Sequence, residues 1–215
     1  MNNRKPIFFT ADFHIQHVNA IVYDERPFKD VNHMAEELIK RYNATVPEDG
    51  ICYFLGDMGN KPEEIKKVID RLNGTKILIL GNHDNKIDSM YNTGFDAVMH
   101  GAVLYFGTHR VTLSHCPLLD TPREDCSHMT KYEGMDPRDI PLWHGNQNPK
   151  HRMLSFKNDG QFHLSGHIHS RKEHPKSKKI LGRQMDVGVC AWGYRPVSRD
   201  EVQSWIDLTL QEEAK

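Results

Sequence analysis

The sequence predicts an α/β fold in which two packed sheets carry helices on their outer faces. Between residues 6 and 80, apolar strand-like runs alternate with segments whose apolar residues recur at helical spacing. This alternation is typical of βαβ units, which form parallel sheets covered on both faces. After about residue 95 the strand-like runs become shorter and follow one another more directly. They predict a second sheet.

The first part of the chain contains two clear helix patterns. Residues 31–42 place apolar side chains on one face, and Asp30 is suited to cap the helix N-terminus. The second pattern covers residues 62–73, with Pro62 at the start and Gly74 as the stop signal. Three apolar runs precede, separate and follow these helices and are predicted as strands: 6–11, 51–55 and 76–80.

The second part of the chain is predicted to be mostly strand. Gly107-Thr108 indicates a hairpin turn, and a terminal helix is expected over residues 198–211. Residues 117–160 are polar and weakly periodic, which is compatible with disorder or with an irregular insertion over an active site. We favour the insertion. The predicted strands of this part are 96–100, 102–106, 110–114, 161–165 and 185–189.

The composition bounds the class of protein. A chain of 215 residues suits a single domain spanning residues 1–215. The net charge of -1 gives no overall attraction to nucleic acid or to an anionic membrane. No apolar run approaches the about 18 residues of a membrane span, and the first residues lack a signal-peptide pattern. The four cysteines form no CxxC pair, so the sequence does not predict a zinc finger or a thioredoxin-like site. We expect a cytoplasmic protein.

Polar residues able to bind metal follow five of the predicted strands. In open α/β sheets, ligands bind at the carboxyl ends of the strands, so these residues are expected to share one rim. A single short match would mean little, but five matches, each after an apolar run, indicate a site. The residues are Asp12 and His14, Asp57, Asn82 and His83, His115, and His167 and His169.

These residue types point to a particular metal chemistry. Asp, His and Asn without a Cys ligand suit Mn, Fe, Co or Zn. They are too many donors for one tetrahedral zinc ion. Two ions that share a carboxylate would use them all, and two-metal sites are suited to in-line displacement at phosphorus.

The ordered motifs resemble those of the calcineurin-like metallophosphoesterase family, and two further segments are similar to its small bacterial and bacteriophage members. That resemblance implies a two-sheet α/β/β/α sandwich with a dinuclear metal centre. The five family motifs are DFH at 12–14, GD at 56–57, GNHD at 81–84, the isolated His115 and GHIH at 166–169. The two further segments are RPF at 26–28 and WGYRPVSRDEV at 192–202.

The resemblance also implies a role for each matching residue. Asp57 corresponds to the carboxylate that bridges the two ions, His83 to an acid beside the substrate, and Asp84 to the carboxylate that orients His83. The implied ions are manganese first, with iron, zinc, cobalt or nickel as alternatives. The first ion would be held by Asp12, His14 and His169, and the second by Asn82, His115 and His167.

The implied activity is hydrolysis of a phosphate ester by a metal-bridging hydroxide, as a phosphodiesterase or phosphatase on small or nucleotide-like substrates. One alternative is a non-catalytic, metal-binding interaction module of the same fold. The other is a nuclease, which would need an extended cationic groove. The motifs do not separate these substrates, and the oligomeric state is left open.

Several neighbouring residues allow two interpretations. His17 is expected either to contact substrate phosphate or to line the rim of the site. Arg26 is a candidate for phosphate binding or for a core ion pair, and the ion pair is favoured. His163, within a predicted strand, is expected in the core. The basic run over residues 171–183 is either a solvated loop or a contact for a phosphate-rich partner.

Overall fold

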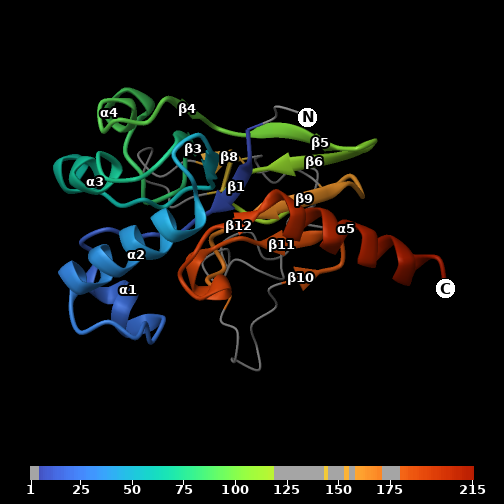
Figure 1. The fold of residues 1–215 in the computed structure, drawn as a ribbon, viewed down its shortest axis with the longest axis horizontal. Helices are drawn as coiled ribbons and strands as arrows, with labels where there is room; N and C mark the ends of the chain where they lie inside the picture. The colour runs from blue at the N-terminus through green and yellow to red at the C-terminus, as the bar shows by residue number, and fades with distance from the viewer. Residues whose placement is uncertain (1–4, 119–142, 145–152, 155–157, 171–179) are drawn as a thin grey trace.

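The computed structural model describes residues 5–118, 143–144, 153–154, 158–170 and 180–215. Two five-stranded sheets form the centre of this part of the chain. Helices α1 to α4 lie on one side of the molecule and α5 on the other (Figure 1). The predicted class, an α/β fold with two sheets flanked by helices, is confirmed. Most of the predicted insertion over 117–160, and the basic run up to residue 179, lie outside the described residues.

The first sheet is parallel apart from one short edge strand. Its strand order is β12-β1-β2-β3-β4. Phe8 of β1 lies opposite Cys52 of β2, which lies opposite Lys76 of β3, so the three central strands end at the same rim. The strands are β1 (Ile7–Thr10), β2 (Ile51–Phe54), β3 (Thr75–Ile79), β4 (Ala97–Met99) and the antiparallel β12 (Val197–Ser198).

The two long helices of this half agree with the sequence, with one difference. Helix α2 (Val31–Thr45) begins after Asp30, whose carboxylate accepts the His33 backbone N–H at 2.8 Å. Helix α3 (Pro62–Ile69) ends before the predicted residue 73. Its last turn tightens, because the N–H groups of Arg71 and Leu72 bond three residues back.

Two short helices were not predicted. They are α1 (Val18–Tyr23) and α4 (Ile87–Tyr91). Val18, Val22 and Tyr23 of α1 are exposed, so no apolar face marks this helix in the sequence. None of the helices in the described ranges has the length and apolar character needed to span a bilayer.

The second sheet has the strand order β10-β11-β9-β6-β5. The predicted hairpin at Gly107-Thr108 is present, with Phe106 opposite His109. The strand predicted over 185–189 ends earlier, at Asp186, and the chain then forms a 3₁₀ helix, Val189–Trp192. The strands are β5 (Ala102–Phe106), β6 (His109–Leu113), β9 (Phe162–Ser165), β10 (Ile180–Leu181) and β11 (Gln184–Asp186). Residues 143–144 and 153–154 form a separate strand pair, β7 and β8.

The apolar core has two parts, one on each face of the first sheet. Adjacent residues of β1 divide between them: Phe8 packs in the cluster that contains α2 and α3, and Phe9 in the cluster shared with the second sheet. This double burial explains why the strands of the first sheet are continuous apolar runs. Helix α5 (Arg199–Glu213) adds Trp205 to the second cluster, with its ring 5.2 Å from that of Phe162.

The N-terminus of α5 carries a reciprocal cap that can be tested. The Ser198 hydroxyl accepts the Glu201 N–H at 3.2 Å, and the Glu201 carboxylate accepts the Ser198 N–H at 2.8 Å. We expect Ser198→Ala to lower the free energy of unfolding by about 1 kcal/mol, measured by urea denaturation. Ser204→Ala, within the same helix, is the control, because its hydroxyl bonds only the Asp200 carbonyl. Equal losses in the two variants would contradict the capping role.

Candidate metal centre

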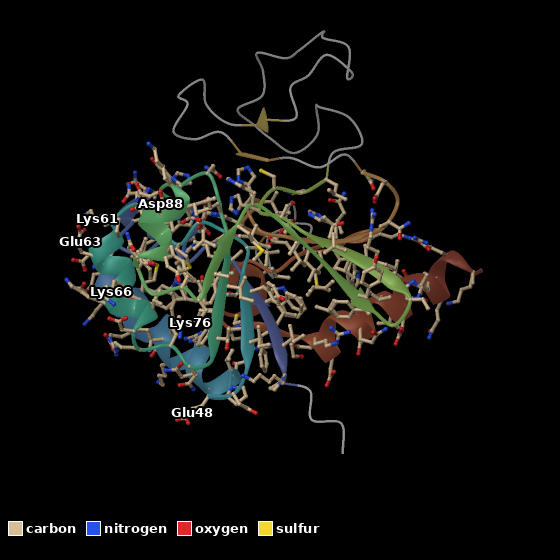
Figure 2. The ribbon with its side chains drawn as sticks, turned by 90° about the horizontal axis from the view of Figure 1, so that it is seen from above. Glu48, Lys61, Glu63, Lys66, Lys76 and Asp88 are labelled. Carbon is tan, nitrogen blue, oxygen red and sulfur yellow. The ribbon has the colours of Figure 1, made fainter. Side chains whose placement is uncertain are left out.

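The candidate site lies at the carboxyl ends of the parallel strands. Figure 2 shows the two ends of the first sheet: Glu48, just before β2, lies at one end, whereas Lys61 and Asp88, which follow β2 and β3, lie toward the other. The segments that follow β1, β2, β3, β6 and β9 carry the predicted polar residues. The topology therefore places them at one rim.

The first group of donors is Asp12, His14, Asp57 and His169. One donor atom from each lies within 4.8 Å of the others. The Nε2 atoms of His14 and His169 are 3.0 Å apart. Nε2 of His14 lies 3.6 Å from Asp57 Oδ2, and Nε2 of His169 lies 3.5 Å from Asp12 Oδ1. Asp12, His14 and Asp57 are buried.

The second group contains Asp57 again, with His115, His167 and Asn82. Nε2 of His115 lies 3.4 Å from Asp57 Oδ2 and 3.2 Å from His167 Nδ1. The side-chain oxygen of Asn82 lies 3.0 Å from each of these two histidine nitrogens. The structure thus brings together all seven residues proposed as ligands, in two groups that share Asp57.

The backbone at these residues is unusual. A non-glycine residue in the left-handed region costs about 1–2 kcal/mol, and such residues concentrate at functional sites. The surrounding fold must therefore hold each one in place. Residues of the two groups with positive φ are Asp12 (62°), His14 (52°), Asp57 (57°), His167 (72°) and His169 (46°).

Glycines pack directly against the two buried carboxylates. A Cβ on Gly81 would lie 2.2 Å from Asp57 Oδ1, and a Cβ on Gly166 would lie 2.6 Å from Asp12 Oδ2. Both distances are too short for any side chain. The glycines that precede Asn82 and His167 in the sequence motifs therefore leave the space that the carboxylates fill.

Hydrogen bonds fix which nitrogen of His115 faces the group. Its Nδ1 lies 2.7 Å from the Leu55 carbonyl oxygen, which can only accept, so Nδ1 carries a proton. In the neutral ring, Nε2 is then an acceptor. It faces the Asn82 oxygen and Asp57 Oδ2. Three acceptors pointing at one another repel unless a proton on Nε2 or a metal cation lies among them.

The charges of the site also favour a cation. Burial alone opposes a charge on His115, but the Asp57 carboxylate outweighs it and raises the His115 pKa to about 9. The same balance, with Asp12 and Asp24 as the acids, raises the pKa of His169 to about 10. Burial lowers the pKa of His14 to about 3, so this ring is neutral. Burial also opposes ionisation of Asp57, but nearby His115 holds its pKa well below the usual value.

Asp24 is a site residue that the sequence did not reveal. It is the C-cap residue that follows α1, and its Oδ2 lies 2.8 Å from Nδ1 of His169. The two residues are 145 positions apart, so only the folded chain brings them together. The one sequence feature nearby is the RPF segment that begins two residues later.

Arg26 is not a substrate-binding residue in this structure. Its side chain is completely buried and pairs with Asp24 at 3.0 Å. The guanidinium also donates to the carbonyl oxygens of Asp12 and Phe13, at 3.0 and 3.1 Å. With its donors used on the protein interior, Arg26 holds the backbone of the first loop. Its tentative assignment to phosphate is corrected to the core ion pair that the sequence favoured.

Asp84 binds backbone groups of two loops. Its carboxylate accepts the N–H groups of Asp57, Met58 and Gly81 at 2.8–2.9 Å and that of Gly59 at 3.3 Å. Burial and the charge of Asp57 raise its pKa to about 7, although the N–H donors favour the ionised form. The predicted role was to orient the ring of His83. These contacts instead assign Asp84 to joining the loop after β2 to the loop after β3.

His83 and His17 lie at the edge of the first group. The exposed His83 ring has its centroid 5.2 Å from that of His14 and 5.8 Å from that of His17. The His83 backbone N–H donates to Asp57 Oδ1 at 2.9 Å, which ties its position to the shared carboxylate. His17 lies 5.4 Å from His14, centroid to centroid.

Two other predictions can be placed. His163 is fully buried, its Nε2 lies 2.8 Å from the Ser114 hydroxyl, and burial lowers its pKa to about 3, so the prediction of a core histidine is confirmed. Arg183, the last residue of the basic run, pairs with Glu213 at 2.5 Å. Arg183 is thus a structural residue, while residues 171–179 lie outside the described ranges.

The fold and site define an α/β sandwich with a cluster of Asp, His and Asn side chains arranged around a shared carboxylate. No family model matches the sequence. An uncharacterized protein of Methanocaldococcus jannaschii is 35% identical over 211 residues, covering 96% of this chain and 94% of that protein. The chain belongs to the family of this archaeal protein.

Other similar proteins extend this comparison. The gene 66 protein of Mycobacterium phage L5 is 29% identical over 227 residues, covering 96% of both chains. A protein of unknown function from Aquifex aeolicus has the same fold, with a TM-score of 0.66 at 20% identity over 94% of this chain and 100% of that one. A phosphoesterase from E. coli, YfcE, gives a TM-score of 0.37 at 15% identity, over 90% of this chain and 82% of that one. Similarity at that level does not define a shared fold.

The contact between Gly81 and Asp57 predicts a specific defect. Gly81→Ala forces the new methyl group onto the Asp57 carboxylate, so we expect the affinity for Mn²⁺ to fall at least about tenfold, measured by calorimetric titration. Gly107→Ala is the control, because Gly107 has a positive φ of 60° and open space around it, so its alanine strains the backbone without displacing a carboxylate. The explanation fails if both variants bind Mn²⁺ equally well.

Proposed function

We propose that this protein is a phosphate-ester hydrolase that uses two divalent metal ions. Asp12, His14 and His169 would hold one ion, and Asn82, His115 and His167 the other. Asp57 would bind both. The observation that carries the proposal is the shared Asp57 carboxylate, whose Oδ2 lies 3.6 Å from a histidine donor of the first group and 3.4 Å from one of the second. The ordered motifs, which resemble those of the metallophosphoesterases, support the same function.

The donor set fits such ions in type and spacing. Ligand atoms bound to one ion at about 2.1 Å lie about 3 to 4 Å from one another. The nitrogen and oxygen atoms around His14 and His115 lie 3.0–3.6 Å apart. Imidazole, carboxylate and amide donors without a thiolate suit manganese, with iron, zinc, cobalt or nickel as alternatives.

The chain's own residues divide the remaining tasks. When bound, two divalent ions supply Lewis acidity toward the phosphate oxygens and make water acidic enough to attack near neutral pH. His83 is exposed beside the first group and would protonate the leaving oxygen. His17 borders the same space and is suited to contact the phosphate. Asp84 joins the loop after β2 to the loop after β3, and so fixes the position of His83.

The role of His83 predicts a loss of turnover without a loss of metal. We expect His83→Ala to reduce kcat by about 10²- to 10⁴-fold on an alkyl phosphate ester, because a positioned general acid contributes that much. The reduction should be smaller for a nitrophenyl ester, whose leaving group needs no proton. Steady-state kinetics on both esters and the metal content of the variant provide the measurement.

His100→Ala is the control for this variant, since His100 is also exposed and lies outside both donor groups. It should retain wild-type kcat on both esters. Full activity of His83→Ala on the alkyl ester would remove His83 from the mechanism.

The function itself is tested by a screen of metal-reconstituted protein against phosphomonoesters, phosphodiesters and cyclic nucleotides. We expect hydrolysis of at least one small ester class in the presence of Mn²⁺. Asp57→Asn should be inactive on that ester, because the variant loses the shared negative charge. Activity confined to oligonucleotides and falling steeply with salt would favour a nuclease. A folded chain that binds two Mn²⁺ ions yet hydrolyses no ester would favour a non-catalytic binding module.

A further inference from the structure

The carboxylate of Asp24 lies behind His169, outside the two donor groups. Its side chain is 12% exposed, and one oxygen, Oδ2, makes its charged contacts. That oxygen lies 2.8 Å from His169 Nδ1 and 3.0 and 3.1 Å from Nη2 and Nε of Arg26. The sequence motifs assign no role to this residue.

We propose that Asp24 is a positioning residue for the first metal ion, which it serves by holding the His169 ring with Nδ1 protonated and Nε2 facing Asp12 and His14. The proposal rests on the metal centre of the proposed function. A carboxylate only accepts, so the nitrogen beside it must carry a proton. The opposite nitrogen is then the one available to an ion. It lies 3.0 Å from His14 Nε2 and 3.5 Å from Asp12 Oδ1.

The His169 side chain is less enclosed than those of His14 and His115, which are 3% and 0% exposed. It is 22% exposed, and the His169 backbone has a left-handed φ of 46°. Carboxylate partners fix the orientation of metal-binding histidines and raise their basicity.

Arg26 links Asp24 to the other half of the first group. Its guanidinium binds Asp24 and also the carbonyl oxygens of Asp12 and Phe13. One ion pair therefore fixes His169 through its ring and the loop of Asp12 and His14 through its backbone. The two segments lie 155 residues apart in the sequence, counted from His14 to His169.

The second group is supported differently. His115 donates from Nδ1 to the backbone carbonyl of Leu55, at 2.7 Å, and so does not rely on an acidic side chain for its orientation. This difference makes the proposal specific. Loss of Asp24 should lower the affinity for the first ion and leave that for the second unchanged. A general structural defect would lower both affinities.

The experiment is a calorimetric titration of metal-free protein with Mn²⁺. For Asp24→Ala we expect one of two sites to weaken by about 10- to 100-fold, with the other unchanged. Asp24→Asn keeps an oxygen acceptor for Nδ1–H and for Arg26, so its loss of affinity should be smaller. Glu213→Ala is the control, because it removes the carboxylate partner of Arg183 away from the site, and it should bind both ions normally.

A second measurement on metal-free protein separates this proposal from the proposed function. A hydrogen bond to a carboxylate slows exchange of an imidazole proton, so the His169 Nδ1–H should give a resolved NMR signal in the wild type. The signal should persist in Asp24→Asn and disappear in Asp24→Ala.

Two wild-type affinities in Asp24→Ala, equal weakening of both sites, or an unchanged Nδ1–H signal would each overturn the role of Asp24. Failure of the wild type to bind Mn²⁺ would instead overturn the proposed function and with it the metal-positioning role, while the NMR signal would still report whether Asp24 holds the ring.

Discussion

The site depends on one buried carboxylate, that of Asp57, which must remain between histidines of two groups. Its Oδ2 lies 3.6 Å from His14 and 3.4 Å from His115, and its Oδ1 accepts the His83 N–H. Removing a carboxylate from water costs several kcal/mol unless nearby charges and donors compensate. In the protein alone, protons on histidines supply that compensation. A divalent cation would supply it more fully.

Two further carboxylates hold the loops that surround Asp57. Asp84 gathers backbone N–H groups from the loops after β2 and β3, and Asp24 connects His169 to Arg26 through side chains. Neither belongs to the two donor groups. Carboxylates outside the donor groups are needed for this purpose, because residues in left-handed backbone conformations keep their positions only when several contacts restrain them.

Much of the fold could be predicted because its causes are local. The runs before Asp12, Asp57 and Asn82 are apolar since those strands are buried on both faces. The donor residues themselves were indicated by short motifs at strand ends. Helices α1 and α4 were missed because they are short, and α1 exposes its apolar residues. The contacts of Asp24 and Asp84 could not be predicted, because they join segments that meet only after folding, and for the same reason sequence alone left Arg26 with two possible roles.

The loop that follows β1 keeps an alternation of two after the strand itself has ended. Asp12 and His14 turn to the donor groups, while Phe13 and Ile15 are 1% and 2% exposed in the core beneath α2. Positive φ at every second residue, 12, 14 and 16, accompanies this alternation. The length of this segment is therefore fixed as strictly as its composition. Insertion or deletion of a single residue here would exchange the two sets, placing a phenylalanine among the donors and a histidine in the apolar core.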